Sequence, residues 1–370
     1  MIPISSAAKL NFFRHPGQDM EKKSNSRKKV LIATGGSGGH LLPAQQLANS
    51  LHPQAEILFA GYGLNRSPFF ERRSYPFFEI SAAPLSKKIF PFLRTLFSGV
   101  RQSIKLLRSE KPDIVIGFGS FHCFPLLLAS LFLRKRIVLF EANCQLGKVN
   151  RFFSPFAKRV AMQFSIPSKK ISLTPLLPWK ESQQCIDRQA ARSELGLFPG
   201  RPVLLVFGGS QGAAFLNQLI PAAVSHDVQV IHLTGKPEWV ADVANAYRMR
   251  KIFAVVKSFE TNMPLVYAAA DAAICRSGAG TLAELIRYGV PALLIPFPHA
   301  TEDHQRANAN FLAKKIGGAK MLLQEEAHLL SHSINALLSE REEMQRALHL
   351  FAKDCEGRIP LSKQILEMIL

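Results

Sequence analysis

The stretch Thr34-Gly35-Gly36-Ser37-Gly38-Gly39-His40 decides the fold of this chain. It follows an apolar run at residues 30–33 and opens a helical pattern that continues to residue 51. A strand, a glycine turn and a helix in this order direct backbone N–H groups and the positive end of a helix dipole at an anion. The stretch therefore predicts an α/β fold that binds a phosphorylated ligand.

A second glycine turn has the same setting. The sequence Gly-Gly-Ser-Gln-Gly at 208–212 follows a strand-like run at 202–207 and opens another helical pattern. Strand-like runs alternate with helical patterns along most of the chain, which is typical of parallel sheets. We therefore predict two Rossmann-like parallel-sheet domains that face each other across a ligand-binding cleft. The expected strands are residues 29–34, 56–60, 113–118, 137–141 and 160–164, then 203–207, 228–233, 254–259, 272–275 and 292–296.

The composition between these runs indicates the domain boundaries. Residues 1–28 are basic and lack the apolar core of a signal peptide, so we predict a flexible extension. A stretch at 165–200 is rich in Pro, Ser, Gln and charged residues, and we expect the linker near residues 175–184 within it. We predict an N-terminal domain at 29–180, a C-terminal domain at 181–340, and terminal helices at 341–370 that could pack back on the first domain.

The chain has 370 residues and a formal net charge of +19, which indicates an anionic partner. Nucleic acid, a phospholipid surface and phosphorylated substrates all fit this charge. The five cysteines are scattered without C-x-x-C spacing, which favours reduced thiols in the cytosol and gives no support for a zinc site. The longest apolar run, residues 124–133, is about half the length of a membrane-spanning helix, so we expect none.

A dinucleotide-binding turn is the competing interpretation of the first glycine turn. That motif requires G-x-G-x-x-G and an acidic residue at the end of the second strand, where it binds a ribose. In this chain His40 follows the last glycine, and the second strand ends in Phe59-Ala60-Gly61. The sequence therefore disfavours NAD as a cofactor.

Polar residues at helix starts and strand ends are the candidate catalytic groups. His40 begins a helix beside the glycine turn, and an imidazole that titrates near neutral pH suits a general base or a substrate contact. Alternatively, it fills the helix start and hydrogen-bonds the backbone. Glu141 and Asn143 end an apolar strand, a place where parallel sheets commonly bind ligands. Capping of the following loop is the alternative for both.

The segment 275–285, Cys-Arg-Ser-Gly-Ala-Gly-Thr-Leu-Ala-Glu-Leu, combines glycines with a helix start. Glu284 lies one turn into this helix, where a carboxylate can accept ribose hydroxyls while phosphates lie at the helix start. A solvated helix glutamate is the alternative. Gln305 and Asn308 share one face of a later helix, and their amides suit sugar hydroxyls or else serve as capping or surface groups. Because no Asp-x-Asp occurs, we expect no metal bridging a diphosphate, and helix ends and basic groups would stabilise it instead.

A basic and apolar segment at 81–109 contains no acidic residue. Such a segment could rest on an anionic bilayer, with each basic group contributing about 1 kcal/mol near the surface. An ordinary helix with its apolar side in the core is the alternative. Nucleic-acid binding would draw only on the charge, since no recognition motif is visible. The predicted membrane patch comprises Lys87, Lys88, Phe90, Phe92, Leu93, Arg94 and Phe97.

Taken together, the two glycine turns, the strand-end Glu-Ala-Asn at 141–143, the segment at 275–284 and Pro-His-Ala-Thr-Glu-Asp-His-Gln-Arg-Ala-Asn-Ala at 298–309 resemble the MurG family. The resemblance implies a metal-independent GT-B glycosyltransferase of peptidoglycan synthesis that transfers N-acetylglucosamine (GlcNAc) from UDP-GlcNAc to lipid I, without a cofactor. It also implies a peripheral protein on the cytoplasmic face of the inner membrane, with cell-wall synthesis proteins as further partners.

The resemblance also implies roles for particular residues. His40 is the expected general base and Glu141 the second choice. Ser37, Gly38, Gly39 and Asn143 would lie by the donor's phosphates and sugar, and Phe259 and Glu260 would hold uracil. The remaining donor contacts implied are Lys180, Ser210, Gln211, Gly212, Ala279, Gly280, Thr281, Leu282, Ala283, Glu284, Gln305 and Asn308.

The chain also departs from the family pattern. Phe140 stands where the family commonly has His, Gly119-Ser120-Phe121-His122 replaces a Gly-Gly-Tyr loop, and Lys180 would replace an arginine. These departures concern acceptor handling more than the donor site. Another GT-B enzyme, such as a glycolipid glycosyltransferase or a UDP-GlcNAc epimerase, therefore stays open, and so does a basic nucleic-acid binder.

Overall fold

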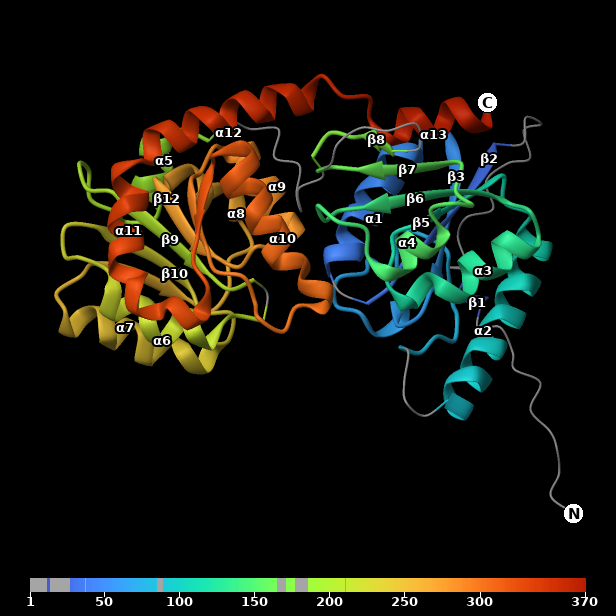
Figure 1. Cartoon of the computed structure of the whole chain (residues 1–370), viewed down its shortest axis with the longest axis horizontal. Helices are drawn as coiled ribbons and strands as arrows, with labels where there is room; N and C mark the ends of the chain where they lie inside the picture. Colours follow the sequence, from blue (N-terminus) through green and yellow to red (C-terminus); the bar gives the residue numbers. More distant parts are fainter. Residues whose placement is uncertain are drawn as a thin grey trace, which may run out of the picture. The chain divides into compact units, whose positions relative to one another are not determined.

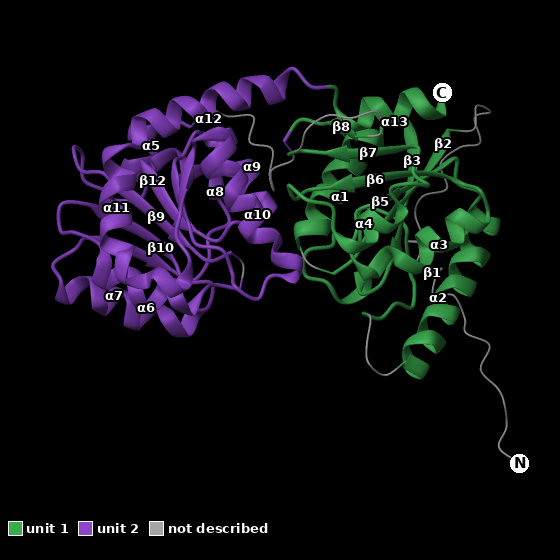
Figure 2. Cartoon of the chain, in the orientation of Figure 1, with its two compact units in different colours: residues 1–175, 359–370 green, residues 176–358 purple. Residues whose placement is uncertain are grey.

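The computed structural model describes residues 12–13, 27–36, 38–84, 89–164, 171–176, 186–209 and 211–370. The chain forms two compact units (Figure 2). Unit 1 comprises Met1–Pro175 and Ile359–Leu370, and unit 2 comprises Leu176–Arg358. Each unit has its own sheet and its own core, so we describe each by itself.

Unit 1 contains an eight-stranded sheet among its described residues, in the order β1-β4-β3-β2-β5-β6-β7-β8. Every neighbouring pair in this order is parallel except β1 and β4. The strands are β1 (Phe12–Phe13), β2 (Lys28–Ala33), β3 (Ala55–Gly61), β4 (Phe77–Glu79), β5 (Ile114–Gly117), β6 (Arg136–Glu141), β7 (Arg159–Met162) and β8 (Ile171–Leu173). The helices are α1 (Gly38–Leu51), α2 (Ile89–Glu110), α3 (Phe124–Phe132), α4 (Lys148–Phe153) and α13 (Leu361–Ile369) (Figure 1).

Unit 2 contains a six-stranded, fully parallel sheet among its described residues, in the order β11-β10-β9-β12-β13-β14. The strands are β9 (Val203–Phe207), β10 (Gln229–Leu233), β11 (Ala254–Lys257), β12 (Ala272–Cys275), β13 (Ala292–Leu294) and β14 (Ala319–Met321). The helices are α5 (Arg188–Glu194), α6 (Ala214–Ala223), α7 (Val240–Met249), α8 (Met263–Ala269), α9 (Ala279–Tyr288), α10 (His304–Asn310), α11 (Leu330–Ser339) and α12 (Arg341–Glu356).

The apolar runs form strands because both faces of each sheet are covered by helices. All five residues of β9 are buried, and β10 is equally buried. In both sheets the chain order reverses beside the strand that leads into the glycine turn, between β2 and β5 in unit 1 and between β9 and β12 in unit 2. Open parallel sheets bind their ligands at the carboxyl ends of the strands at such a reversal. The prediction of two parallel-sheet units is confirmed.

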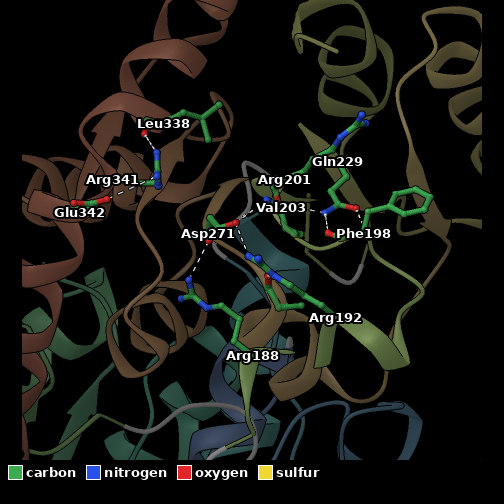
Figure 3. Close-up of polar contacts among 11 residues, drawn as sticks. Arg188, Arg192, Phe198, Arg201, Val203, Gln229, Asp271, Leu338, Arg341 and Glu342 are labelled. Atoms are coloured by element: carbon green, nitrogen blue, oxygen red, sulfur yellow. Dashed lines mark hydrogen bonds and ion pairs between the residues drawn. The ribbon is translucent and has the colours of Figure 1, made fainter. Parts of the chain in front are cut away.

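An ion-pair network attaches α5 to the unit 2 sheet (Figure 3). The carboxylate of Asp271 lies 3.0 Å from Arg188 Nη1 and 2.5 Å from Arg192 Nη2. The same carboxylate accepts a hydrogen bond from the backbone N–H of Val203 at 2.7 Å. Asp271 precedes β12 and Val203 begins β9, so one side chain ties the first helix of unit 2 to its two central strands.

The terminal helices predicted at 341–370 are divided between the two units. In unit 2, Gln345 Nε2 of α12 donates to the Gly289 carbonyl oxygen at 3.0 Å. In unit 1, the buried Gln364 of α13 accepts from Ser172 Oγ at 2.7 Å and from Arg159 Nη1 at 3.3 Å. Residues 341–370 therefore do not act as one structural segment, because α12 makes its polar contacts with unit 2 and α13 makes its own with unit 1.

Candidate active site

The first glycine turn connects β2 to α1 at the carboxyl edge of the unit 1 sheet. The N–H of Thr34 donates to the Ala60 carbonyl oxygen at 3.1 Å, which ties the turn to the end of β3. Gly36 has a φ of 81°, and a Cβ at this position would lie 2.5 Å from His122 Cε1. The turn thus requires glycine at 36, and it leads into the start of α1 at Gly38 and Gly39.

His40 lies in the first turn of α1, with its ring fixed by a backbone group. Its Nδ1 lies 2.8 Å from the carbonyl oxygen of Phe118, which follows β5. A carbonyl oxygen can only accept a hydrogen bond, so Nδ1 carries the proton and Nε2 of the neutral ring carries the lone pair. This is the tautomer that a general base acting through Nε2 requires. A hydrogen bond to the backbone is also what the structural alternative for His40 expects, so the general-base role stays a prediction.

Glu141 organises the loop that follows β6. Its Oε1 accepts hydrogen bonds from the backbone N–H and the Nδ2 of Asn143, at 3.1 Å and 3.0 Å. Its Oε2 accepts from the N–H of Gly147 and from Asn150 Nδ2, both at 3.0 Å. The carboxylate is 4% exposed, so these four donors surround it. This geometry favours a positioning role for Glu141, which holds Asn143 in place.

The second glycine turn connects β9 to α6 at the carboxyl edge of the unit 2 sheet. The N–H of Gly212 donates to the Gly209 carbonyl oxygen at 2.9 Å. A Cβ on Gly212 would lie 2.1 Å from the Thr234 carbonyl oxygen, so only glycine allows this approach to the end of β10. Gln211 is exposed at the tip of the turn. The described residues of this turn therefore lie at the carboxyl edge of the sheet, where parallel sheets commonly bind ligands.

The helix α9 begins directly after β12 and presents uncapped N–H groups. Its N-cap residue, Gly278, has no side chain to cap them, and Gly280 is exposed with open space around its Cα. Ala279 and Thr281 complete this first turn, while the following Leu282 and Ala283 are buried in the core. The start of α9 is accordingly suited to bind an anion such as a diphosphate.

Glu284 lies on the second turn of α9 and is not a solvated helix glutamate. The residue is 8% exposed, and its Oε2 accepts a hydrogen bond from Tyr267 Oη at 2.9 Å. The Tyr267 ring stacks on Tyr288 with centroids 5.1 Å apart. Burial, and then the charge of Glu284, raise the pKa of Tyr267 well above its usual value, so the phenol remains a donor. A carboxylate held in this way can accept ribose hydroxyls.

Gln305 and Asn308 of α10 form hydrogen bonds with the segments next to the start of α9. Gln305 Oε1 accepts from the N–H of Phe297 at 2.9 Å, and the Gln305 carbonyl oxygen accepts from Ser277 Oγ at 2.7 Å. Asn308 is fully buried, and its Nδ2 donates to the Ser277 carbonyl oxygen at 3.0 Å. Both amides therefore lie beside the segment that precedes α9, where they shape the site.

The loop after β11 is the candidate base-binding element. Phe259 is 46% exposed there. Glu260 accepts from Lys257 Nζ and from the N–H of Asn262, both at 2.8 Å. Burial alone would raise the pKa of Glu260, but these hydrogen bonds outweigh it and lower the pKa. Glu260 thus stays ionised and holds the loop in place.

Sequence reasoning missed two residues that shape the unit 2 site. Tyr267 could not be found because its bond to Glu284 depends on how α8 packs on α9. Arg276 lies within the quoted segment, but its burial to 9% exposure was not foreseen. Its Nη1 donates to the carbonyl oxygens of Ile295 and Pro296, at 2.9 Å and 3.1 Å. It thereby fixes the end of β13 next to the start of α9.

The first turns of α2 form an exposed apolar surface. Phe90 is 81% exposed, Leu93 52% and Phe97 72%, whereas the buried residues of α2 lie from Gly99 onward. The interpretation as an ordinary core helix therefore applies only to the second half of α2. Phe92 is half-buried and Arg94 is exposed.

Several predicted residues cannot be placed. Ser37, Lys87, Lys88, Lys180 and Ser210 lie outside the described residues. Among the residues that the structure describes, no helix is long and apolar enough to cross a membrane. In the same part of the chain, no group of three or more His, Cys, Asp or Glu side chains could hold a metal ion.

Comparison with known families defines the class of protein. Residues 30–162 match the N-terminal domain of glycosyltransferase family 28, and residues 203–358 match its C-terminal domain. The two parallel-sheet units are those of a GT-B glycosyltransferase, as predicted from the sequence. The crystal structure of the glycosyltransferase VinC with dTDP shares this fold, with a TM-score of 0.66 at 16% identity over 92% of this chain and 98% of VinC.

Proteins with higher sequence identity than VinC show to which glycosyltransferase family the chain belongs. A UDP-N-acetylglucosamine--N-acetylmuramyl-(pentapeptide) pyrophosphoryl-undecaprenol N-acetylglucosamine transferase of Protochlamydia amoebophila is 40% identical over 81% of this chain and 84% of the relative. A protein with the same name from Hydrogenovibrio crunogenus is 34% identical over 85% of this chain and 88% of the relative. The crystal structure of Acinetobacter baumannii MurG matches with a TM-score of 0.74 at 26% identity, covering 92% of this chain and 99% of that one. The chain belongs to the MurG family of glycosyltransferases.

Proposed function

We propose that this enzyme transfers GlcNAc from UDP-GlcNAc to undecaprenyl-pyrophosphoryl-MurNAc-pentapeptide, which is lipid I, and so forms lipid II for peptidoglycan synthesis. The observation that carries the proposal is the buried Glu284 carboxylate, held by Tyr267 at 2.9 Å one turn beyond the uncapped start of α9. This pair of features suits the ribose and the diphosphate of one nucleotide. The names of the relatives supply the sugar and the acceptor.

Donor binding is assigned to unit 2. The diphosphate would bind the N–H groups at the start of α9 and the second glycine turn, with Ser210, Gln211 and Gly212. The loop at Phe259 and Glu260 would hold uracil through its backbone. Gln305 would lie by GlcNAc, the fully buried Asn308 would support the site through the Ser277 backbone, and Lys180 would take the place of the family arginine. Helix ends and backbone donors would then stabilise the leaving UDP without a metal ion.

Proton removal is assigned to His40 in unit 1. The acceptor hydroxyl attacks the anomeric carbon of GlcNAc in line, the bond from that carbon to the UDP oxygen breaks, and UDP leaves with the electron pair. His40 Nε2 takes the hydroxyl proton as the new bond forms, which gives an inverting transfer. Ser37, Gly38, Gly39 and Asn143 would position the sugar and phosphates beside it. Glu141 would position Asn143.

The exposed residues of α2 would attach the enzyme to the membrane that holds lipid I. Exposed aromatic and aliphatic side chains with Arg94 beside them in α2 suit the surface of an anionic bilayer, and Lys87 and Lys88 precede this helix in the sequence. The enzyme would then be a peripheral protein on the cytoplasmic face of the inner membrane, where other cell-wall synthesis proteins could meet it.

Thin-layer analysis of products distinguishes this function from its alternatives. The enzyme is incubated with labelled UDP-GlcNAc and either a lipid I analogue, a diacylglycerol acceptor, or no acceptor. We expect a labelled lipid-linked disaccharide only with the lipid I analogue. A labelled product with the diacylglycerol, or an epimerised sugar without an acceptor, would contradict the proposal.

A further inference from the structure

The serine at position 120 has a backbone conformation that is normally restricted to glycine. Its φ is 66° and its ψ is 157°. Residues other than glycine persist in this region only where the surrounding structure enforces it, and such sites cluster at functional positions. Ser120 lies three residues after the end of β5, at the carboxyl edge of the sheet. The contacts of the Ser120 side chain should therefore explain why a serine occupies this position.

The hydroxyl of Ser120 contacts the imidazole of His122. Ser120 Oγ lies 2.7 Å from His122 Nδ1. The imidazole also stacks on Phe121, with ring centroids 3.9 Å apart, and on Tyr62, with centroids 5.9 Å apart. Glycine at 120 would relax the backbone but remove the only side chain that bonds this nitrogen in the described structure. The strained serine is therefore explained by the orientation of His122.

His122 lies directly against the first glycine turn. A Cβ on Gly36 would lie 2.5 Å from His122 Cε1, and one on Gly35 would lie 2.9 Å from His122 Cβ. The turn follows β2 and His122 follows β5, and these are the neighbouring strands at which the chain order reverses. In open parallel sheets this is the position of the ligand. The imidazole is thus built into the ligand-binding edge of unit 1.

The ring is neutral in this setting. Burial, and then the nearby His40, lower the pKa of His122 to about 4. When the Ser120 hydroxyl donates to Nδ1 of a neutral ring, the ring proton lies on Nε2, which then acts as a donor. His122 would therefore bind an oxygen atom by a directed hydrogen bond, while His40 keeps the lone pair that proton removal needs.

We propose that His122 donates a hydrogen bond from Nε2 to a phosphate or hydroxyl oxygen of the substrate at the first glycine turn, and that Ser120 is its positioning residue. The proposal rests on the proposed function, because it takes the glycine turn as part of the transfer site. The oxygen belongs either to the lipid-linked acceptor or to the donor sugar nucleotide.

Steady-state kinetics of Ser120→Gly, His122→Ala and the double variant test this pair. We expect Ser120→Gly to keep or raise the Tm while kcat/KM falls about tenfold, the size of one lost hydrogen bond in a bound complex. His122→Ala should lose at least as much. The double variant should lose no more than His122→Ala, because the hydroxyl acts only through the imidazole. A KM that rises for one substrate identifies which substrate carries the oxygen.

Lys111→Gly is the matched control, since Lys111 also has a positive φ, 49°, but lies at the opposite end of β5. It should keep kcat/KM within about twofold of the wild type, since its side chain is remote from the glycine turn. If Ser120→Gly behaves like this control, or if the double variant loses the product of the two single losses, the inference is wrong. If His122→Ala does not fold, the kcat/KM of Ser120→Gly relative to Lys111→Gly decides whether the inference holds. A wild type without transfer activity would contradict the proposed function and this inference together, whereas an active wild type isolates the inference.

Discussion

At the scale of single residues, the orientation of His40 is the feature on which the proposed proton removal depends. Its hydrogen bond to the Phe118 carbonyl oxygen, 2.8 Å long, fixes both the ring and the tautomer. The other candidate base, Glu141, has its carboxylate surrounded by four N–H donors. The sequence could only rank His40 above Glu141 as the candidate general base. The hydrogen bonds around the two side chains support the same order.

Replacement of His40 by alanine should lower kcat about 10²- to 10⁴-fold, the usual contribution of a general base. The affinity for UDP should not change, because the nucleotide is assigned to unit 2. Turnover with a lipid I analogue and calorimetry with UDP measure the two effects. His226→Ala, at an exposed position, is the control. Near-normal turnover of His40→Ala would show that another group takes the proton.

Glu284→Ala should weaken UDP binding about 10- to 100-fold, since hydrogen bonds to a charged group contribute roughly 1.5–3 kcal/mol. The variant removes the carboxylate that Tyr267 holds in place. Calorimetric titration with UDP measures the change, and Glu343→Ala on an exposed position of α12 is the control. Equal affinities for the two variants would remove Glu284 from the ribose site.

A buried histidine makes unit 2 sensitive to acid. His232 Nε2 lies 3.0 Å from Asn217 Oδ1, and its Nδ1 lies 3.0 Å from Tyr247 Oη, so one nitrogen donates and the other accepts. Burial lowers the pKa of His232 to about 3 in the folded state. Between about pH 6.5 and 3 the unfolded chain therefore binds a proton that the folded chain does not.

The free energy of unfolding should accordingly fall with decreasing pH below about 6.5, by up to about 1.4 kcal/mol per pH unit from His232 alone. Urea unfolding of the wild type and of His232→Gln at several pH values measures this contribution as the difference between the two slopes. Above about pH 7 the difference in stability should be constant. Parallel curves below pH 6 would mean that His232 is protonated in the folded protein.

At the scale of the elements, α2 combines two surfaces in one helix. Its second half packs in the core of unit 1, whereas its first turns expose large apolar side chains. Exposed apolar groups beside basic ones attach proteins to membranes by burial in the interface, at about 0.8 kcal/mol per buried CH₂ group. The helix is therefore the element that we expect to contact the bilayer.

The variant Phe90→Ser, Leu93→Ser, Phe97→Ser should sediment with anionic liposomes at least about tenfold more weakly than the wild type, because three apolar anchors are removed. A matched variant carries Met249→Ser and Leu350→Ser, which are 77% and 73% exposed in unit 2. It should sediment like the wild type. If both variants lose binding equally, the effect is general hydrophobicity and α2 is not the docking element.

The strands that consist of apolar runs were predicted from the sequence. The short strands that form because they pair with a neighbouring strand were not. β9 and β12 read as strands because every residue of each is apolar and buried. β4, β8 and β14 have three residues each, too few for a pattern, and they exist because a neighbouring strand pairs with them. The site residues on the glycine turns were predicted because the turns are visible as sequence motifs. Tyr267 was missed because its contact with Glu284 depends on how α8 packs on α9.

At the scale of the whole molecule, the division into two units follows from two glycine-led sheets, each with its own core. The end of the chain could not be predicted in the same way. The helical pattern of the terminal segment does not reveal that α13 belongs to unit 1, because this depends on the buried contacts of Gln364 with β7 and β8. The net charge of +19 fits phosphorylated substrates and an anionic membrane equally.

The most direct test of the central claim is the stoichiometry of transfer in the presence of EDTA. The enzyme is supplied with labelled UDP-GlcNAc and a lipid I analogue, and both UDP and the lipid-linked disaccharide are quantified over time. We expect one disaccharide to form for each UDP released, at a rate that EDTA does not change. UDP release with free sugar as the product, or label that stays in UDP-GlcNAc, would contradict it.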